Sequence, residues 1–350
     1  MDFGLFIAAQ HPSGSMADHV DRHLEQVRTA RESGFSAVYA NHHYFSNPYQ
    51  QLHPMPFLAR IAAESGDMRL GVGILLTALL NPVDVCEQVT TLDAITHGRF
   101  IFGVGLGYRD VEFEAFGIDR TRRVRIFEEG LELIRRLWTE PVVSHTGERI
   151  TLRDVTWPTR PIQQPHPPIW IAANNDPAVR RAARLGDAWM INPHTRLDVL
   201  SRQMEVYREA LDKAGKPFPA VVPIIKDVYL GATREEAIRD ARPFLEEKYR
   251  TYVKWGQNEA LPMDDSIDVP FDELQDDRFI LGTPDDLIEA LERYEKELGV
   301  NHVAFRLQWP GADHATPQGK VLNAIRLIGE RVVPHFARRS PTGGVRSIGR

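Results

Sequence analysis

Residues 98–117 have the sequence GRFIFGVGLGYRDVEFEAFG, and this stretch decides the fold that we expect. Residues 99–104 alternate in character and predict a short buried strand. The strand ends in closely spaced glycines around Gly105, where a ligand could approach the backbone. A dinucleotide-binding fingerprint would need a further glycine where Tyr108 stands, so the spacing argues against a Rossmann fold.

Working outward from this strand, the chain repeats a strand followed by a helix. The predicted strands are 3–8, 37–41, 70–76, 100–104, 169–173, 188–191, 221–230 and 300–307. The predicted helices are 17–33, 84–96, 122–138, 178–185, 197–214, 234–252, 284–298 and 320–335. Strands that alternate with helices, without a break in composition, favour a single α/β domain, a (β/α)8 TIM barrel, over an open doubly wound sheet.

Three segments depart from this rhythm. Residues 142–157 alternate around a Thr-Gly pair and predict an inserted β-hairpin, which a proline-rich connector follows. Residues 255–279 form a polar insertion that could act as a lid over the barrel. We therefore expect one barrel domain over residues 1–337 and a disordered tail over residues 338–350, which are rich in Arg, Ser and Gly.

The composition excludes several classes of protein. The chain has 350 residues, 43% of them hydrophobic, without a long apolar run, so we expect neither disorder nor a membrane partner. A net charge of -6 argues against a nucleic-acid partner. The single cysteine, Cys86, implies no disulfide scaffold, and the N-terminus lacks the basic region of a signal peptide. These features predict a cytoplasmic location.

In a barrel of this kind, the chemistry lies just past the carboxyl ends of the strands. The side chains at these positions are Gln10, His11, Asn41, His42, His43, Tyr44, Gly105, Tyr108, Arg109, Asn174, Asn175, Asp176, Asn192, His194, Arg306, Gln308 and Trp309. Asn174 and Asn175 precede a helix whose free N–H groups and dipole suit a phosphate.

Other charged and histidine side chains near these positions have a more ordinary interpretation. Adjacent residues of a strand point to opposite sides, so we expect only one of His42 and His43 to face the barrel mouth, and no metal site. We expect His43 to have a structural role, and Glu112 and Glu114 to be surface or capping carboxylates of a helix.

Four blocks of the sequence together resemble one known family. They are ESGFSAVYANHHYF, RLGVGILLTALLNPVDVCEQVTTLDAITHGRFIFGVGLGYRDVEFEAFGID, RVRIFEEGLELIRRLW and PIQQPHPPIWIAANNDPAVRRAARLGDAW. In this order and spacing they resemble the bacterial luciferase-like flavin-dependent monooxygenases over roughly the first 310 residues. The resemblance implies a barrel with inserted segments that binds reduced FMN or a deazaflavin at the carboxyl ends of its strands.

The resemblance also implies roles for single residues. His42 matches the active-site histidine of the family's Glu-His-His motif, although Asn41 stands where the family has the glutamate. Gly73 and Ile74 match the position of a non-prolyl cis peptide beside the flavin ring. The alternative for His42 is a structural hydrogen-bonding role, and for the Gly73-Ile74 segment it is an ordinary strand with a bulge.

Further matches concern the flavin phosphate and the edge of the ring. Arg123 matches an arginine that opens a long helix in the family and would contact the phosphate, with an exposed helix cation as its alternative. Tyr108 and Arg109 lie where family members contact the flavin or the substrate, and we assign Tyr108 and Gly105 to the cofactor site. Luciferase itself has an arginine where Leu106 stands, so phosphate binding differs in detail here.

We therefore expect a flavin-dependent monooxygenase, the oxygenase component of a two-component system. Reduced FMN from a separate flavin reductase would react with O2 to a flavin 4a-hydroperoxide, which oxygenates a small organic substrate. Two alternatives stay open on the same barrel, a deazaflavin-dependent oxidoreductase that transfers hydride and a non-catalytic flavin-binding protein. A metal-dependent hydrolase is a remote option. We also expect a homo-oligomer, either a dimer or a tetramer.

Overall fold

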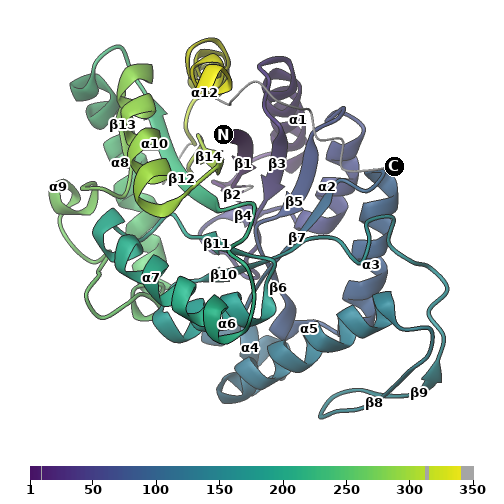
Figure 1. Ribbon diagram of the computed structural model, residues 1–350. Coiled ribbons are helices and arrows are strands. Elements are labelled where there is room, and N and C mark those ends of the chain that lie inside the picture. The colour runs from purple at the N-terminus through teal and green to yellow at the C-terminus, as the bar shows by residue number, and fades with distance from the viewer. Residues whose placement is uncertain (9, 312–314, 340–350) are drawn as a thin grey trace.

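The computed structural model describes residues 1–8, 10–311 and 315–339, and its centre is a barrel of parallel strands (Figure 1). The barrel strands are β1 (Asp2–Ile7), β3 (Ala37–Ala40), β5 (Arg69–Val72), β7 (Phe100–Gly105), β10 (Ile169–Ala173), β11 (Ala188–Ile191), β12 (Pro223–Leu230) and β14 (His302–Arg306). Strand β1 pairs with both β3 and β14, and β7 pairs with β10, so the ring is closed. The predicted (β/α)8 barrel is confirmed.

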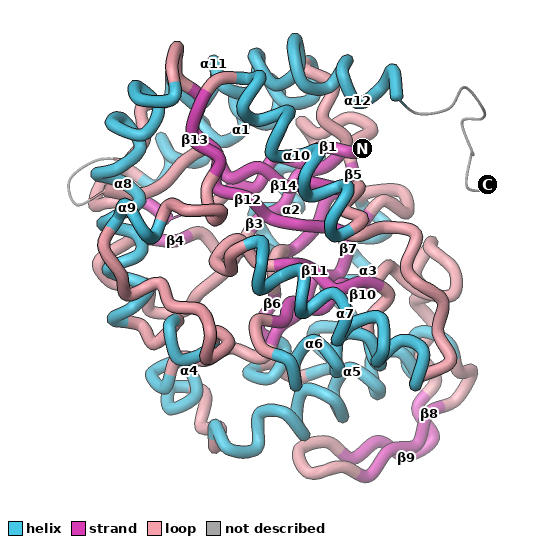
Figure 2. Tube along the Cα trace, turned by 60° about the vertical axis from the view of Figure 1, so that its left-hand side comes forward, coloured by secondary structure: helices cyan, strands magenta, loops and turns pink. Residues whose placement is uncertain are grey.

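Helices surround the strands, as both views of the chain show (Figures 1 and 2). They are α1 (Met16–Glu32), α2 (Pro54–Ala62), α3 (Pro82–Ile95), α4 (Asp110–Ala115), α5 (Arg123–Thr139), α6 (Asp176–Leu185), α7 (Leu197–Lys213), α8 (Arg234–Lys254), α9 (Phe271–Leu274), α10 (Pro284–Leu298), α11 (Gln318–Leu327) and α12 (Val333–Arg339). Short strands complete the fold, namely β2 (Gln10–His11), β4 (Gln50–Gln51), β6 (Leu75–Leu76), β8 (Val143–Thr146), β9 (Thr151–Val155) and β13 (Ile280–Gly282).

Local sequence signals explain where helices begin and end, and α10 shows this most fully. The side chain of Thr283 accepts the backbone N–H of Asp286, whose carboxylate accepts the N–H of Thr283 in return, and Pro284 occupies the first turn. The helix ends at Leu298, and the next residue, Gly299, has a φ of 74° in the left-handed region that glycine tolerates. These signals act locally in the sequence, and the predicted bounds of this helix, residues 284–298, are correct.

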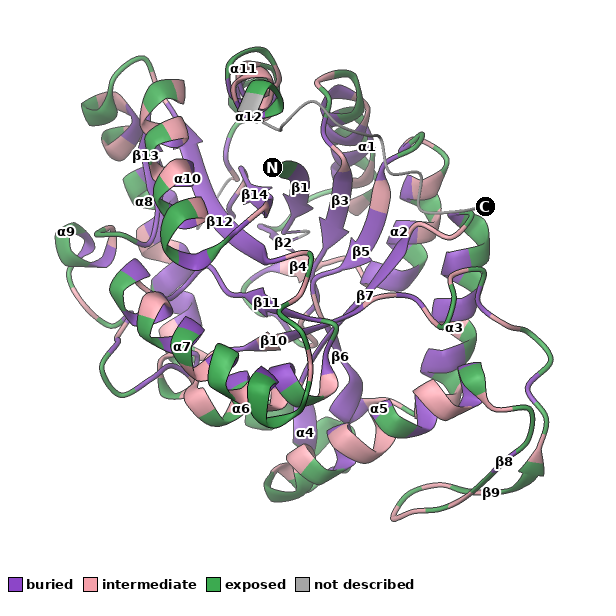
Figure 3. Cartoon of the chain, in the orientation of Figure 1, coloured by how far each residue is buried: buried purple, intermediate pink, exposed green. Residues whose placement is uncertain are grey.

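Apolar side chains fill two layers, one inside the barrel and one between strands and helices. The inner layer contains Phe6, Tyr39, Ile101, Trp170 and Met190 from different strands. Figure 3 shows the barrel strands buried over most of their length, while the outer faces of the helices and the hairpin of β8 and β9 are largely exposed. This filling makes the barrel a solid support, so a site can open only at its ends.

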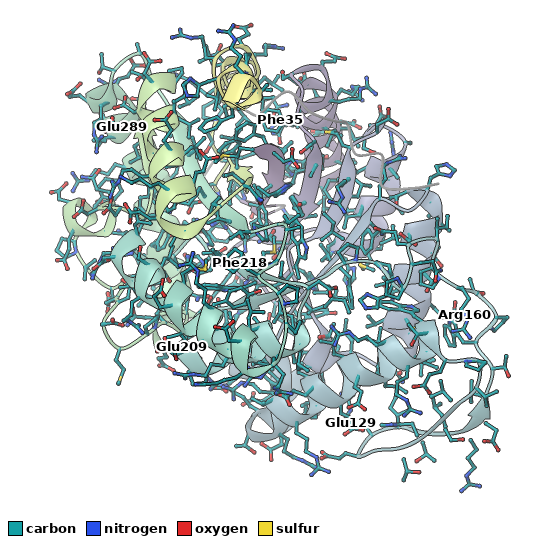
Figure 4. All side chains as sticks on the ribbon, in the orientation of Figure 1. Phe35, Glu129, Arg160, Glu209, Phe218 and Glu289 are labelled. Carbon is teal, nitrogen blue, oxygen red and sulfur yellow. The ribbon has the colours of Figure 1, made fainter. Side chains whose placement is uncertain are left out.

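The predicted hairpin is formed by β8 and β9 and projects at the lower right of Figure 1. Two residues labelled in Figure 4 hold this region against α5. Glu129 of α5 accepts hydrogen bonds from His145 Nε2 at 3.0 Å and from the backbone N–H of Glu148 at 3.1 Å. Arg160 of the proline-rich connector donates to the carbonyl of Leu137 at 2.7 Å.

Three details differ from the predicted elements. The strand predicted over residues 70–76 is interrupted, because β5 ends at Val72 and β6 begins at Leu75. The sequence analysis missed α2 and the three-residue strand β13, which is too short to show a period. Helix α12 continues to Arg339, so the first two residues of the predicted tail are helical, and residues 340–350 of that tail lie outside the described residues.

None of the helices within the described ranges has the length and apolar character needed to span a lipid bilayer.

Candidate active site

An open cavity lies at the carboxyl ends of the barrel strands, with a volume of about 1220 Å³ that includes space open to solvent. It is lined by every residue that the sequence analysis assigned to catalysis or to cofactor binding, namely His42, Gly73, Ile74, Gly105, Tyr108, Arg123, Asn174 and Asn175. The barrel therefore brings these residues together from five segments of the chain. Their individual roles stay predictions.

One end of the cavity carries two arginines and a helix N-terminus. Arg123 begins α5, and its guanidinium donates to the carbonyl of Arg120 at 2.9 Å. Burial and the neighbouring charges of Arg120 and Arg181 lower the pKa of Arg123. Arg120 pairs with Asp110 at 2.8 Å, whereas Arg123 has no carboxylate partner among the described residues. Opposite, Asn175 caps α6 by accepting the backbone N–H of Ala178 at 3.1 Å. Together these groups suit an anion such as a phosphate.

The middle of the cavity has a wall of backbone. The Gly73-Ile74 peptide is cis, as the family resemblance implied. A Cβ atom added to Gly73 would lie 2.7 Å from Phe6 Cε2, and one added to Gly105 would collide with the side chain of Ile74. Larger residues therefore cannot replace either glycine without moving this wall. A planar ring could lie against it.

His42 lies in the loop after β3 and faces other aromatic rings. Its ring centroid is 4.1 Å from that of Tyr44 and 4.5 Å from that of His53. Burial, together with His53 and His43, lowers the pKa of His42 to about 3, so the imidazole is neutral at neutral pH. Its Nδ1 atom is buried and has no hydrogen-bond partner among the described residues.

The expectation that only one of the adjacent histidines faces the barrel mouth is wrong. Strand β3 ends at Ala40, so His42 and His43 lie in a loop where the alternation of a strand does not apply, and both line the cavity. His43 Nδ1 lies 3.3 Å from Glu112 Oε1. Tyr108 also lines the cavity, and its hydroxyl is buried without a hydrogen-bond partner among the described residues.

The interpretation of Glu112 as a surface or capping carboxylate is also wrong. Its side chain is 0% exposed. The carboxylate accepts the backbone N–H of Tyr44 at 2.9 Å and lies 3.5 Å from Arg109 Nη1. Arg109 in turn donates to the carbonyl of Phe45 at 2.9 Å. The sequence pattern of α4, a helix of six residues, does not indicate this contact with the loop of His43.

A buried ionic network borders the cavity on the side of β12 and β14. Asp227 accepts from Arg306 Nε at 2.5 Å, from Lys248 Nζ at 2.5 Å and from the Tyr249 hydroxyl at 3.1 Å. Burial alone would raise the pKa of Asp227, but Arg306 and Lys248 outweigh it and hold that pKa far below its usual range. Tyr249 links this network to His194, whose Nδ1 lies 3.1 Å from its hydroxyl oxygen.

The structure separates the other rim residues into two groups. Asn192, His194 and Arg306 line the cavity, whereas His11, Gln308 and Trp309 do not. Trp309 is 0% exposed and donates to Asp227 Oδ1 at 2.8 Å, so it is part of the packing. The sequence analysis missed Arg120 and Tyr252, although the predicted lid segment supplies three lining residues, Gln257, Glu259 and Ala260.

Within the described ranges, no group of three or more His, Cys, Asp or Glu side chains is placed to hold a metal ion.

Comparison with solved structures shows which proteins share this barrel. The monooxygenase RslO1 from Streptomyces bottropensis superposes with a TM-score of 0.84 at 26% identity, over 96% of this chain and 100% of that one. The oxygenating constituent of 3,6-diketocamphane monooxygenase from Pseudomonas putida, in complex with FMN, gives a TM-score of 0.76 at 19% identity, over 95% and 98% of the two chains. An F420-dependent secondary alcohol dehydrogenase gives 0.75 at 17% identity, over 94% and 97%.

Sequence comparison gives a consistent result. A phthiodiolone/phenolphthiodiolone dimycocerosates ketoreductase of Mycobacterium tuberculosis is 30% identical over 172 residues, which cover 48% of this chain and 45% of that protein. The model of the luciferase-like monooxygenase family matches residues 1–302. Because this match covers most of the chain and the barrel is the one its solved neighbours share, the chain belongs to the luciferase-like monooxygenase family of oxidoreductases.

Proposed function

We propose that this protein is an FMN-dependent monooxygenase that oxygenates a small organic substrate with O2. The observation that carries the proposal is the likeness to the monooxygenase RslO1, which extends over 96% of this chain at 26% identity. The proposal includes a separate flavin reductase as the source of reduced FMN, and a homo-oligomer, dimer or tetramer. Sedimentation of the purified protein would measure its oligomeric state.

The cavity residues fit a flavin mononucleotide. Its phosphate would lie between Arg123, Arg120 and the N-terminus of α6, where the guanidinium of Arg123 has no carboxylate partner among the described residues. Its ring would lie against the wall that Gly73, Ile74 and Gly105 form. When bound, reduced FMN would supply the electrons that activate O2 for transfer of one oxygen atom to the substrate.

The protein's own task is to orient the substrate, handle protons and exclude water. His42 is neutral at neutral pH, because its pKa is lowered to about 3, chiefly by burial. A neutral imidazole has one N–H donor and one acceptor, so His42, which lines the cavity, could accept a proton at one ring nitrogen and release one at the other. Gln257 and Glu259, in the segment after α8, line the cavity and would limit the entry of water.

Two measurements test this proposal together. Anaerobic titration with FMN and with the deazaflavin F420, followed by absorbance, measures which cofactor binds. A turnover assay under ¹⁸O2 with a flavin reductase then measures whether one labelled oxygen atom enters a substrate. We expect tight binding of reduced FMN and incorporation of the label. Exclusive binding of F420, or turnover without oxygen, would replace this proposal with the second candidate.

The second candidate is a deazaflavin-dependent oxidoreductase that transfers hydride to or from a substrate carbon. The observation in its favour is the 30% identity over 172 residues to a protein named as a ketoreductase. The same cavity would then bind the longer cofactor at the same basic end. The two candidates differ in their need for O2, which the labelling assay measures directly.

A further inference from the structure

His194 follows β11, on the side of the cavity that the proposed cofactor residues leave open. The cofactor residues come from the segments after β5, β7 and β10, whereas His194 comes from the loop after β11, Tyr252 from α8 and Arg306 from β14. The backbone of His194 is held in place, because its N–H donates to Asn192 Oδ1 at 2.8 Å and its carbonyl accepts from Arg278 Nε at 2.9 Å. His194 therefore presents its ring to the cavity from a rigid loop.

The hydrogen bonds around Tyr249 determine which ring nitrogen of His194 carries the proton. The Tyr249 hydroxyl lies 3.1 Å from Asp227 Oδ2 and 3.1 Å from His194 Nδ1. A hydroxyl has one proton, and a carboxylate can only accept, so the proton of Tyr249 points to Asp227. The Tyr249 oxygen must then accept a hydrogen bond from His194 Nδ1–H. Nε2 consequently keeps its lone pair.

The surrounding charges keep both side chains in these states. Burial, followed by the charges of Lys248 and Arg306, lowers the pKa of His194 well below its usual value, so the ring is neutral. Burial and Asp227 raise the pKa of Tyr249 well above its usual value, so the hydroxyl keeps its proton. Nε2 has no hydrogen-bond partner among the described residues, and His194 lines the cavity.

We propose that His194 is a specificity-determining residue whose Nε2 accepts a hydrogen bond from a hydroxyl group of the substrate, so that the substrate is a neutral hydroxylated molecule such as a phenol. This inference rests on the proposed oxygenation site for the identity of the ligand. The proposal does not make His194 a strong general base, because protonation would add a positive charge beside those of Lys248 and Arg306. His194 would orient the substrate through this hydrogen bond and would not remove the proton of the hydroxyl group.

The ring proton can be measured without any turnover. In protein labelled with ¹⁵N-histidine, we expect the His194 signals to show a protonated Nδ1 and a bare Nε2 between pH 6 and pH 9, with or without a cofactor. The signals that disappear from the spectrum of the His194→Asn variant are those of His194. A protonated Nε2 would overturn the proposal. This readout is independent of the choice between FMN and F420.

Binding of two matched probes, 1-naphthol and 1-methoxynaphthalene, tests the hydroxyl. Calorimetry with the FMN-loaded protein, or with the F420-loaded protein if only F420 binds, should show tighter binding of the naphthol. His194→Asn keeps a donor toward Tyr249 but has no acceptor at the position of Nε2, so naphthol affinity should fall about tenfold, as for one lost hydrogen bond, while the ether is unaffected. Equal affinities of the two probes in the unmodified protein, or no binding of the naphthol, would overturn the proposal.

A second variant separates positioning of His194 from its mere presence. Tyr249→Phe removes the acceptor of Nδ1–H but leaves His194 in place. We expect a mixture of the two ring protonation forms in the ¹⁵N spectrum and a loss of naphthol affinity with unchanged ether affinity. If Tyr249→Phe leaves both the spectrum and the naphthol affinity unchanged, the network does not control His194, and the proposal fails.

Discussion

The carboxylate of Glu112 accepts the backbone N–H of Tyr44 at 2.9 Å, although the two residues lie 68 positions apart in the chain. This contact joins α4 to the loop that carries His42 and His43. The second oxygen of the carboxylate, Oε2, is buried without a partner among the described residues. The position of the proposed catalytic loop therefore depends on a carboxylate outside it.

Replacing Glu112 should loosen this loop. Glu112→Gln removes the charge that Arg109 faces and weakens the acceptor of the Tyr44 N–H, so we expect the free energy of unfolding to fall by about 1.5 to 3 kcal/mol. Chemical denaturation measures this loss. The exposed Glu114 of the same helix is the matched control, and Glu114→Gln should change stability by less than about 0.5 kcal/mol. Equal effects of the two variants would show that the Tyr44 contact is unimportant.

Removal of His42 should affect turnover far more than cofactor affinity. His42→Ala takes away the neutral imidazole that would pass protons, and we expect turnover to fall by about 100-fold or more while FMN affinity is nearly unchanged. Steady-state kinetics and a flavin titration measure the two quantities. His97→Asn is a control on the exposed surface, since asparagine tolerates the positive φ of 53° at that position. Full activity of His42→Ala would assign His42 a structural role.

The phosphate contact can be isolated by comparing two flavins. Arg123→Ala should weaken FMN binding by roughly 1.5 to 3 kcal/mol, because it removes a charge-assisted hydrogen bond, yet it should spare riboflavin, which has no phosphate. Arg125→Ala, at an exposed position of the same helix, should leave both affinities unchanged. If Arg123→Ala weakens both flavins equally, Arg123 supports the fold, and the N-terminus of α6 becomes the leading phosphate site.

A histidine cluster formed by β2 and α1 should make the protein sensitive to acid. His11 Nε2 and His23 Nε2 lie 2.9 Å apart, and the rings of His11 and His19 stack with centroids 3.8 Å apart. Burial and the neighbouring histidines lower the pKa of His11 to about 2, and burial lowers that of His23 to about 4, from 6.5 in the unfolded chain. Protonation therefore favours the unfolded chain below pH 6.5.

The free energy of unfolding should accordingly fall as the pH drops from 6.5 toward 4. Each of these two histidines contributes a slope of up to about 1.4 kcal/mol per pH unit, because the unfolded chain binds one more proton there. Denaturation at several pH values measures the slope, and His23→Gln should reduce it. An unchanged slope in that variant would mean that other groups control the acid sensitivity.

Much of the fold was predictable from the sequence because its signals are local. These signals are hydrophobic periods of two or 3.6 residues, helix-starting residues such as Thr283 and helix-ending residues such as Gly299. Each acts within a few residues, so it can be recognised without knowledge of the rest of the chain. The order of strands and helices then implied the barrel. The family blocks added the Gly73-Ile74 cis peptide and the residues of the cavity.

The structure alone decided how residues from distant segments meet. The sequence predicted correctly that His42 and His43 lie near the carboxyl end of a strand. Because that strand already ends at Ala40, the alternation of a strand does not apply to them, and both line the cavity. The pairing of Arg306 with Asp227, 79 positions apart, and of Glu112 with Tyr44 left no local pattern. Closure of the barrel brings these side chains together and removes them from water, and burial is what determines their charge states. Local sequence determines where a strand ends, whereas the environment of its last side chains depends on every strand of the ring.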